Sequence, residues 1–308
     1  MKEMACNLWQ NIIINKGQED IMKYQFERTR SDFWITVHEN DDAYSISTND
    51  RYVDIINYFF PILERNSPTK WRKSENYANM SNLWLPEGCY DQNIMTEFIN
   101  WSEEVTNKVL WLSLNKNIKE YFDDELDYCI ASDFNIVYGE GRTEIGEAEY
   151  QLKYNIEDLS VTERNQYANI IMSKMLDNCK YIPFNNGLNW CVSPMPATKF
   201  GKTKLAWQMA EEISQQLRLS FIKPILSCDK PQMKQLSIKE KIETWEKIYY
   251  NNGVILDNQV RGKNVIVVDD LYQSGATMWE YAKFLKSLGA RCVFGIVCVK
   301  SLRDSDNT

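Results

Sequence analysis

The second half of the chain alternates short apolar runs with stretches in which apolar residues recur at helical spacing. The apolar runs predict strands at residues 129–138, 190–195, 221–226, 264–268 and 291–299. The amphipathic stretches predict helices at residues 162–176, 205–217, 237–249 and 276–288. This alternation is typical of a parallel sheet with helices on both faces, in which ligands bind beside the carboxyl ends of the strands.

The first half of the chain has a different pattern. Helical spacing predicts helices at residues 50–63 and 91–114, and a short apolar run predicts a strand at residues 34–37. Residues 66–86 are rich in turn formers and are expected to be irregular. We recognise no chemical motif in this half, and we expect its many aromatic residues in a core or in contacts with a partner protein.

The chain length of 308 residues is more than one typical domain needs and fits two. From the two patterns we predict a mixed, mainly helical domain over residues 1–120. We predict an α/β domain over residues 121–308. Within the second domain, Ser237 and Glu240 have the spacing of a capping box and mark the start of a helix.

Charge and residue usage narrow the class of protein. The net charge is −8, which argues against wrapping DNA or RNA, although a local basic patch stays open. The eight cysteines form no Cys-x-x-Cys pair, and His38 is the single histidine. Zinc-ligand spacing and a Ser-His-Asp site are therefore not favoured, and we expect reduced thiols. With neither a signal peptide nor an apolar run of about 18 residues, we expect a cytoplasmic protein that does not span a membrane.

The segment with the clearest chemistry is residues 264–277. Four apolar residues, Val265 to Val268, predict a buried strand, and Asp269 and Asp270 stand at its carboxyl end. The loop that follows enters a helix, whose first N–H groups and positive dipole end favour an anion such as a phosphate. Two adjacent carboxylates can accept hydrogen bonds from two ribose hydroxyls. Any α/β protein contains buried strands followed by a turn, but adjacent acids at a strand end need donors, metal or solvent, so we favour a sugar-phosphate site.

This segment resembles the phosphoribosyl-diphosphate (PRPP) signature of type I phosphoribosyltransferases. Residues 142–154, 193–196 and 235–241 resemble further segments of the ComF-like, competence-type branch in order and spacing. The resemblance covers about residues 125–300. The chain departs from the family at the loop, where Gln273 and Ser274 replace two threonines, and in having no cysteine-rich zinc ribbon.

The resemblance implies roles for individual residues. Asp269 and Asp270 would hold the ribose hydroxyls as the catalytic pair. The 5-phosphate would lie on the loop formed by Gln273, Ser274, Gly275, Ala276 and Thr277. The diphosphate, with Mg²⁺, would contact the residues 195–202 through Pro196, Lys199 and Lys202. Lys199 and Lys202 also fit a simpler role as solvated loop charges. Residues 227–236 would form a mobile loop over the diphosphate, or an ordinary surface loop.

Three functions are consistent with these features. The first is transfer of the phosphoribosyl group to a nitrogenous base. The second is a non-catalytic regulator or effector that senses PRPP or a nucleotide, as in bacterial toxin–antitoxin, retron or phage-defence systems, with residues 1–120 contacting a partner protein. The third is a role in handling nucleic acid, against which the acidic net charge argues.

Overall fold

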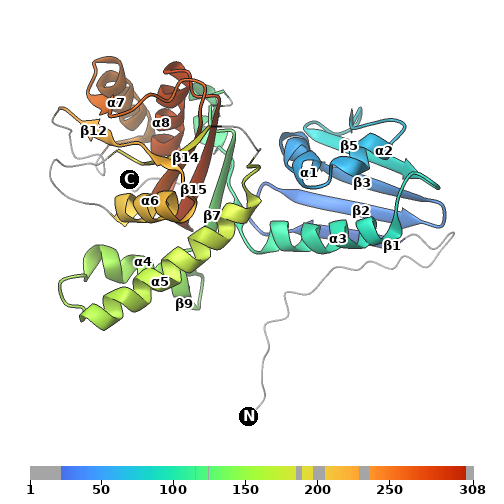
Figure 1. Ribbon diagram of the computed structural model, residues 1–308, viewed down its shortest axis with the longest axis horizontal. Coiled ribbons are helices and arrows are strands. Elements are labelled where there is room, and N and C mark those ends of the chain that lie inside the picture. The colour runs from blue at the N-terminus through green and yellow to red at the C-terminus, as the bar shows by residue number, and fades with distance from the viewer. Residues whose placement is uncertain are drawn as a thin grey trace, which may run out of the picture. The chain divides into compact units, whose positions relative to one another are not determined.

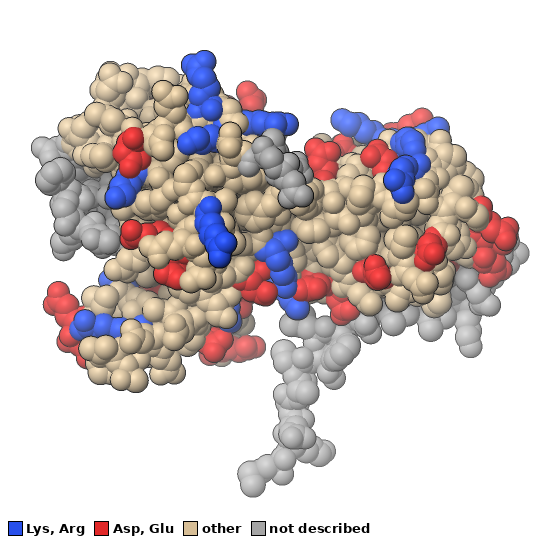
Figure 2. Space-filling view, viewed as in Figure 1, with Lys and Arg blue, Asp and Glu red and all other residues tan. Residues whose placement is uncertain are grey.

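The chain divides into two compact units in a computed structural model, one over residues 1–108 and one over residues 109–308 (Figure 1). The structure describes residues 22–114, 116–123, 125–184, 189–196, 205–228 and 236–302. No helix in these described ranges is long and apolar enough to cross a membrane. Acidic and basic side chains are interspersed over the face shown in Figure 2.

The first unit contains a five-stranded antiparallel sheet with the order β1-β2-β3-β5-β4. Its strands are β1 (Met22–Glu27), β2 (Trp34–Asn40), β3 (Ala43–Asn49), β4 (Arg72–Lys73) and β5 (Met80–Pro86). Its helices are η1 (Asp50–Tyr52), α1 (Val53–Phe59), α2 (Pro61–Asn66) and α3 (Gln92–Asn107). Ring contacts of Trp101 in α3 with Phe59 and Phe60 join the helices into one layer.

The prediction of a mainly helical N-terminal region is therefore wrong. Its strands carry a period of two, in which small polar residues such as Ser45 and Ser47 alternate with buried Tyr44 and Ile46. Residues 66–86, expected to be irregular, contain β4 and β5. The helix expected at residues 50–63 is interrupted before Pro61, whose missing N–H cannot continue the helical ladder.

The second unit contains a six-stranded sheet with the order β11-β10-β14-β15-β7-β6. Its strands are β6 (Leu110–Trp111), β7 (Tyr128–Phe134), β10 (Trp190–Pro194), β11 (Ser220–Phe221), β14 (Asn264–Tyr272) and β15 (Cys292–Lys300). All neighbours run parallel except β6, which pairs antiparallel with β7 at one edge. The predicted α/β fold with a sheet flanked by helices is confirmed, with this one antiparallel strand added.

Two groups of helices cover this sheet. They are α4 (Glu144–Tyr154), α5 (Val161–Asn178), α6 (Leu205–Gln216), α7 (Ile238–Tyr250) and α8 (Ala276–Ser287). Helices α4, α5 and α6 pack beside one another, and α7 packs on α8, with the sheet between the two groups (Figure 1). The capping box at the start of α7 is confirmed, because Glu240 N donates to Ser237 Oγ and Ser237 N donates to Glu240 Oε2. A second capping box, from Ser160 to Glu163, begins α5.

Short elements complete this unit. The 3₁₀ helices are η2 (Lys116–Tyr121) and η3 (Cys179–Tyr181). Two small ribbons pair β8 (Ile136–Val137) with β9 (Gly141–Arg142) and β12 (Pro224–Leu226) with β13 (Val254–Leu256). The strand expected at residues 129–138 is thus divided into β7 and β8, and the strand expected at residues 221–226 into β11 and β12.

Candidate functional site

Strand β14 carries the two predicted acids at the carboxyl edge of the sheet. Residues Val265 to Val268 are completely buried, while Asp269 and Asp270 are half-buried. The strand continues four residues beyond the predicted end because β15 pairs with it as far as Tyr272. Successive side chains of a strand point to opposite faces, so the two carboxylates leave β14 on different sides of the sheet.

Asp270 is held by a lysine from α4. Lys153 Nζ lies 2.8 Å from Asp270 Oδ2 and 3.0 Å from Glu149 Oε1. Burial raises the pKa of the Glu149 carboxyl, and Lys153 opposes this shift. Burial alone lowers the pKa of Lys153, but the two carboxylates outweigh it and hold the amine protonated. Lys153 was noted only as part of a segment that resembles the ComF-like branch, and Glu149 was not predicted as a site residue. The i,i+4 spacing of the two residues is a recognisable signal for an ion pair.

The loop after β14 has a backbone that requires glycine. Gly275 is the N-cap of α8 and has φ of 86°. A Cβ at this position would overlap the hydroxyl of Tyr272. Ala276 N lies 3.4 Å from Ser274 Oγ, and Ser274 is only 5% exposed. The predicted loop, from Gln273 to Thr277, is therefore a tight turn that presents the amino end of α8, a location suited to an anion.

A second lysine stabilises the conformation of this loop. Lys300, at the end of β15, is 6% exposed and donates from Nζ to Gln273 O at 3.1 Å and to Ser301 O at 2.8 Å. Tyr272 adds a further contact, because its hydroxyl accepts from Trp279 Nε1 at 3.1 Å. Lys300 was not predicted as a site residue, although a lysine that directly ends a strongly apolar strand is a recognisable signal.

Pro196 lies at the same edge of the sheet. Strand β10 pairs with β14 so that Pro194 stands opposite Val268, and Met195 N donates to Val268 O at 2.9 Å. Pro196 follows directly and is buried. The predicted diphosphate contacts Lys199 and Lys202 lie outside the described residues, as do residues 229–235 of the expected mobile loop. The structure thus places Asp269, Asp270, the loop and Pro196 at one edge of the sheet.

Within the described ranges, no group of three or more His, Cys, Asp or Glu side chains has the arrangement of a metal site. Carboxylates at the end of β14 still fit Mg²⁺ that arrives with a diphosphate, since Mg²⁺ commonly takes one or two carboxylates together with ligand phosphates and water.

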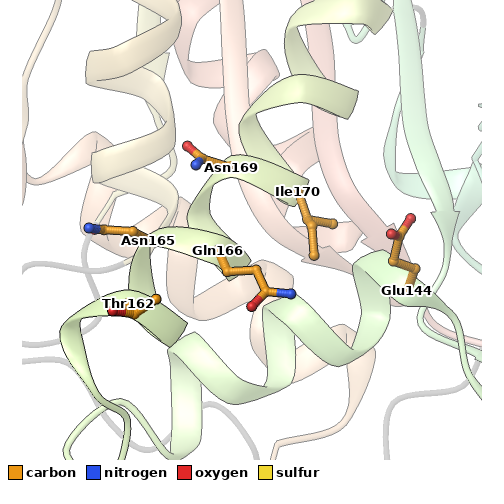
Figure 3. Close-up of a pocket in the computed structure, with 6 residues that line it drawn as sticks. All are labelled: Glu144, Thr162, Asn165, Gln166, Asn169 and Ile170. Carbon is orange, nitrogen blue, oxygen red and sulfur yellow. The ribbon is translucent and has the colours of Figure 1, made fainter.

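A separate open groove of about 580 Å³ lies over α4 and α5 (Figure 3). It is lined by Glu144, Thr162, Asn165, Gln166, Asn169 and Ile170. In Figure 3 the carboxamides project from α5, while Glu144 projects from α4. None of these residues was predicted as a site residue, and none belongs to the carboxyl edge of the sheet described above.

No protein-family model matches the sequence, and no curated protein matches it. Solved structures similar to part of the chain include a purine phosphoribosyltransferase from Pyrococcus horikoshii, with 12% identity, a TM-score of 0.28, and coverage of 46% of this chain and 76% of that one. An adenine phosphoribosyltransferase from Thermoanaerobacter pseudethanolicus shows 16% identity, a TM-score of 0.29, and coverage of 46% and 84%. A hypoxanthine phosphoribosyltransferase from Staphylococcus aureus shows 13% identity, a TM-score of 0.29, and coverage of 46% and 67%. The similarity thus extends over about half of this chain and concerns the fold alone.

Proposed function

We propose that the carboxyl edge of the sheet in the second unit binds PRPP or a related ribose 5-phosphate together with Mg²⁺. The observation that carries this proposal is the arrangement around β14. Two acids leave the end of a buried strand, and a glycine-dependent loop follows directly and starts α8. Carboxylates there can accept hydrogen bonds from ribose hydroxyls, and the N–H groups at the amino end of the helix can bind a phosphate.

The lysines near this edge support an anionic ligand. Lys153 Nζ lies 2.8 Å from Asp270 Oδ2 and compensates the negative charge of Asp270. Lys300 holds the carbonyl of Gln273 and so helps to fix the conformation of the loop. Mg²⁺ would be held by the diphosphate and water, with Asp269 and Asp270 as the protein carboxylates within the site.

We further propose that the bound PRPP serves as a phosphoribosyl donor to a nitrogenous base. The nitrogen would form a bond to C1 of the ribose while the bond from C1 to the diphosphate oxygen breaks, and pyrophosphate would leave. Positioning and charge stabilisation would supply most of the rate increase in such a reaction. We assign no general base to a residue of this chain.

A second candidate function is ligand sensing without transfer, as in a regulator or effector. The contact between Asp270 and Lys153 favours it, because Asp270 already has an ion-pair partner. A ribose that binds Asp270 would compete with Lys153, which also holds Glu149 on α4. Ligand binding would then alter the contacts of α4, a change that a partner protein could detect.

Calorimetric titration of PRPP with Mg²⁺ tests the binding site. The wild-type chain should bind, and the double variant Asp269→Asn, Asp270→Asn should lose binding. A matched control, Asp177→Asn with Glu211→Gln, removes two exposed acids from α5 and α6 and should bind as the wild type does. If the folded wild type does not bind, or the two double variants bind equally, the proposed site is wrong.

Turnover distinguishes the two candidate functions. Pyrophosphate release from PRPP would be followed in the presence of separate purine and pyrimidine bases. Release that depends on one base supports transfer. Binding without release for every base, together with faster hydrogen exchange in α4 on addition of PRPP, supports the sensor.

A further inference from the structure

The sheet of the first unit has one face covered by helices and one face that these helices do not cover. The side chains of Tyr24, Val37, Ile46 and Leu83 share the covered face. Their neighbours along each strand point the other way. We call this second side the outer face and define it by three rows of side chains. The inference about the outer face does not depend on the proposed PRPP site.

Cross-strand pairing defines the rows of the outer face. The first row contains Lys23, His38, Ser45 and Trp84. The second row contains Gln25, Thr36, Ser47, Asn82 and Arg72. The third row contains Glu27, Trp34, Asn49 and Met80. All of these described side chains are exposed or half-exposed, and Trp84 is 46% exposed.

The composition of the outer face differs from that of the whole chain. The chain has a net charge of −8, but the three rows carry the cations Lys23 and Arg72 and the single acid Glu27. Burial and Lys23 lower the pKa of His38, so its ring is neutral at pH 7 and can donate or accept a hydrogen bond. The remaining polar groups are hydroxyls and carboxamides, which commonly contact phosphates and base edges.

The two tryptophans provide aromatic surfaces on opposite sides of these polar groups. Trp34 and Trp84 are two strand spacings apart across the sheet, with β3 between them, and two rows apart along it. This corresponds to roughly 17 Å between their Cα atoms for standard sheet spacing. Such a distance fits a segment of several nucleotides, with a base stacked on each ring and hydrogen bonds to the row between them.

We propose that the outer face binds single-stranded nucleic acid. Aromatic rings accept bases by stacking, while Lys23 and Arg72 neutralise phosphates, and a flat sheet admits an unpaired strand more readily than a duplex. Protein–protein interfaces are enriched in Trp, Met and Arg but depleted in Ser, Lys and Glu. Because the three rows also hold Ser, Lys and Glu and no Leu, Ile, Val or Phe, we favour nucleic acid over a protein partner. The acidic net charge of the chain lowers the affinity at long range but leaves this local chemistry in place.

Fluorescence anisotropy with the full-length chain tests the proposal. The probes are fluorescein-labelled 12-nucleotide single strands of mixed sequence, as DNA and as RNA, and the corresponding DNA duplex, at 50 mM salt. We expect one of the single strands to bind more tightly than the duplex, and the DNA and RNA arms identify which. The variant Asp269→Asn, Asp270→Asn should bind these probes as the wild type does.

Two variants of the outer face separate stacking from charge. Trp34→Ala with Trp84→Ala should weaken binding by about 5-fold to 150-fold for each lost stack. Lys23→Gln with Arg72→Gln should lower the slope of log affinity against log salt by about 1.4, as expected for two phosphates on a single strand. The control Tyr250→Ala removes an aromatic side chain that is 66% exposed in the second unit and should change nothing.

Three results would overturn the proposal. They are absence of binding to both single strands by the folded wild type, equal affinity for duplex and single strands, and unchanged affinity in the folded double tryptophan variant. Circular dichroism verifies the fold of each variant.

Discussion

Replacing Lys153 by Met provides a sharp test of the electrostatics around Asp270. Lys153 Nζ contacts Asp270 and Glu149, whose side chains are only 16% and 5% exposed. The substitution keeps most of the aliphatic length and removes the charge, leaving two poorly solvated carboxylates without their shared cation. Loss of one partner from a buried ion pair costs about 3–5 kcal/mol. Because the lysine side chain is 25% exposed, we expect the lower end, about 3 kcal/mol.

A control ion pair between the same two residue types lies at the surface. Lys174 lies 3.0 Å from Glu144, but these side chains are 39% and 64% exposed. An exposed pair contributes at most about 1 kcal/mol, so Lys174→Met should have a small effect. The difference between the two variants therefore measures the combined effect of burial and of the second carboxylate, Asp270, that only Lys153 contacts.

Urea unfolding at pH 8 and pH 5, followed by circular dichroism, measures both variants. A change of about 3 kcal/mol moves the midpoint by about 1–3 M for typical urea dependences. The pKa of Glu149 is already raised by burial and should rise further without Lys153. Protonation then removes the uncompensated charge, so the penalty in Lys153→Met should be largest at pH 8 and smaller at pH 5. Equal shifts for the two variants at pH 8, or a penalty independent of pH, would refute this reasoning.

Three further substitutions give separate predictions. Gly275→Ala should destabilise the protein by about 2–4 kcal/mol in thermal unfolding, because the new Cβ combines a left-handed backbone with overlap on Tyr272. The control Gly139→Ala has a similar φ but open space around the Cβ, and should cost about 1 kcal/mol. Burial raises the pKa of Glu280 to about 7, so the free energy of unfolding of the wild type should fall by up to about 3 kcal/mol between pH 5 and pH 8. Glu280→Gln should remove that part of the pH dependence. Parallel curves of stability against pH for the two proteins would contradict the prediction. Ser237→Ala should cost about 1 kcal/mol in urea unfolding, because it removes the capping box of α7, and no loss would show that the cap is energetically neutral.

Local sequence was sufficient where a short segment determines its own structure. The run from Val265 to Val268 predicted the buried strand correctly, and the Ser237–Glu240 spacing predicted the start of α7 correctly. The roles of Asp269 and Asp270 in ligand binding stay a prediction. Their position at the edge of the sheet followed from the pattern, although pairing with β15 extends the strand past them.

Tertiary contacts explain what could not be predicted. Leu110 was expected in a helix but belongs to β6, because its pairing partner, Ala131, lies in a separate segment. The contact of Lys153 with Asp270 joins α4 to β14 across more than a hundred residues, and no local pattern contains it. The sheet of the first unit was missed because its outward residues include small serines beside buried Tyr44 and Ile46, a weak signal for a strand.

The strand order of the second unit has a consequence for folding on the ribosome. Strand β7 pairs with β15, and Val293 N also donates to the carboxylate of Asp127, 166 residues earlier in the sequence. At about 5–20 residues per second, β7 would wait roughly 10–30 s for its partner. The antiparallel strands β1, β2 and β3 of the first unit pair with near neighbours in sequence and can associate at once. We therefore expect β7 to need protection from aggregation during synthesis, while the first unit is already folded.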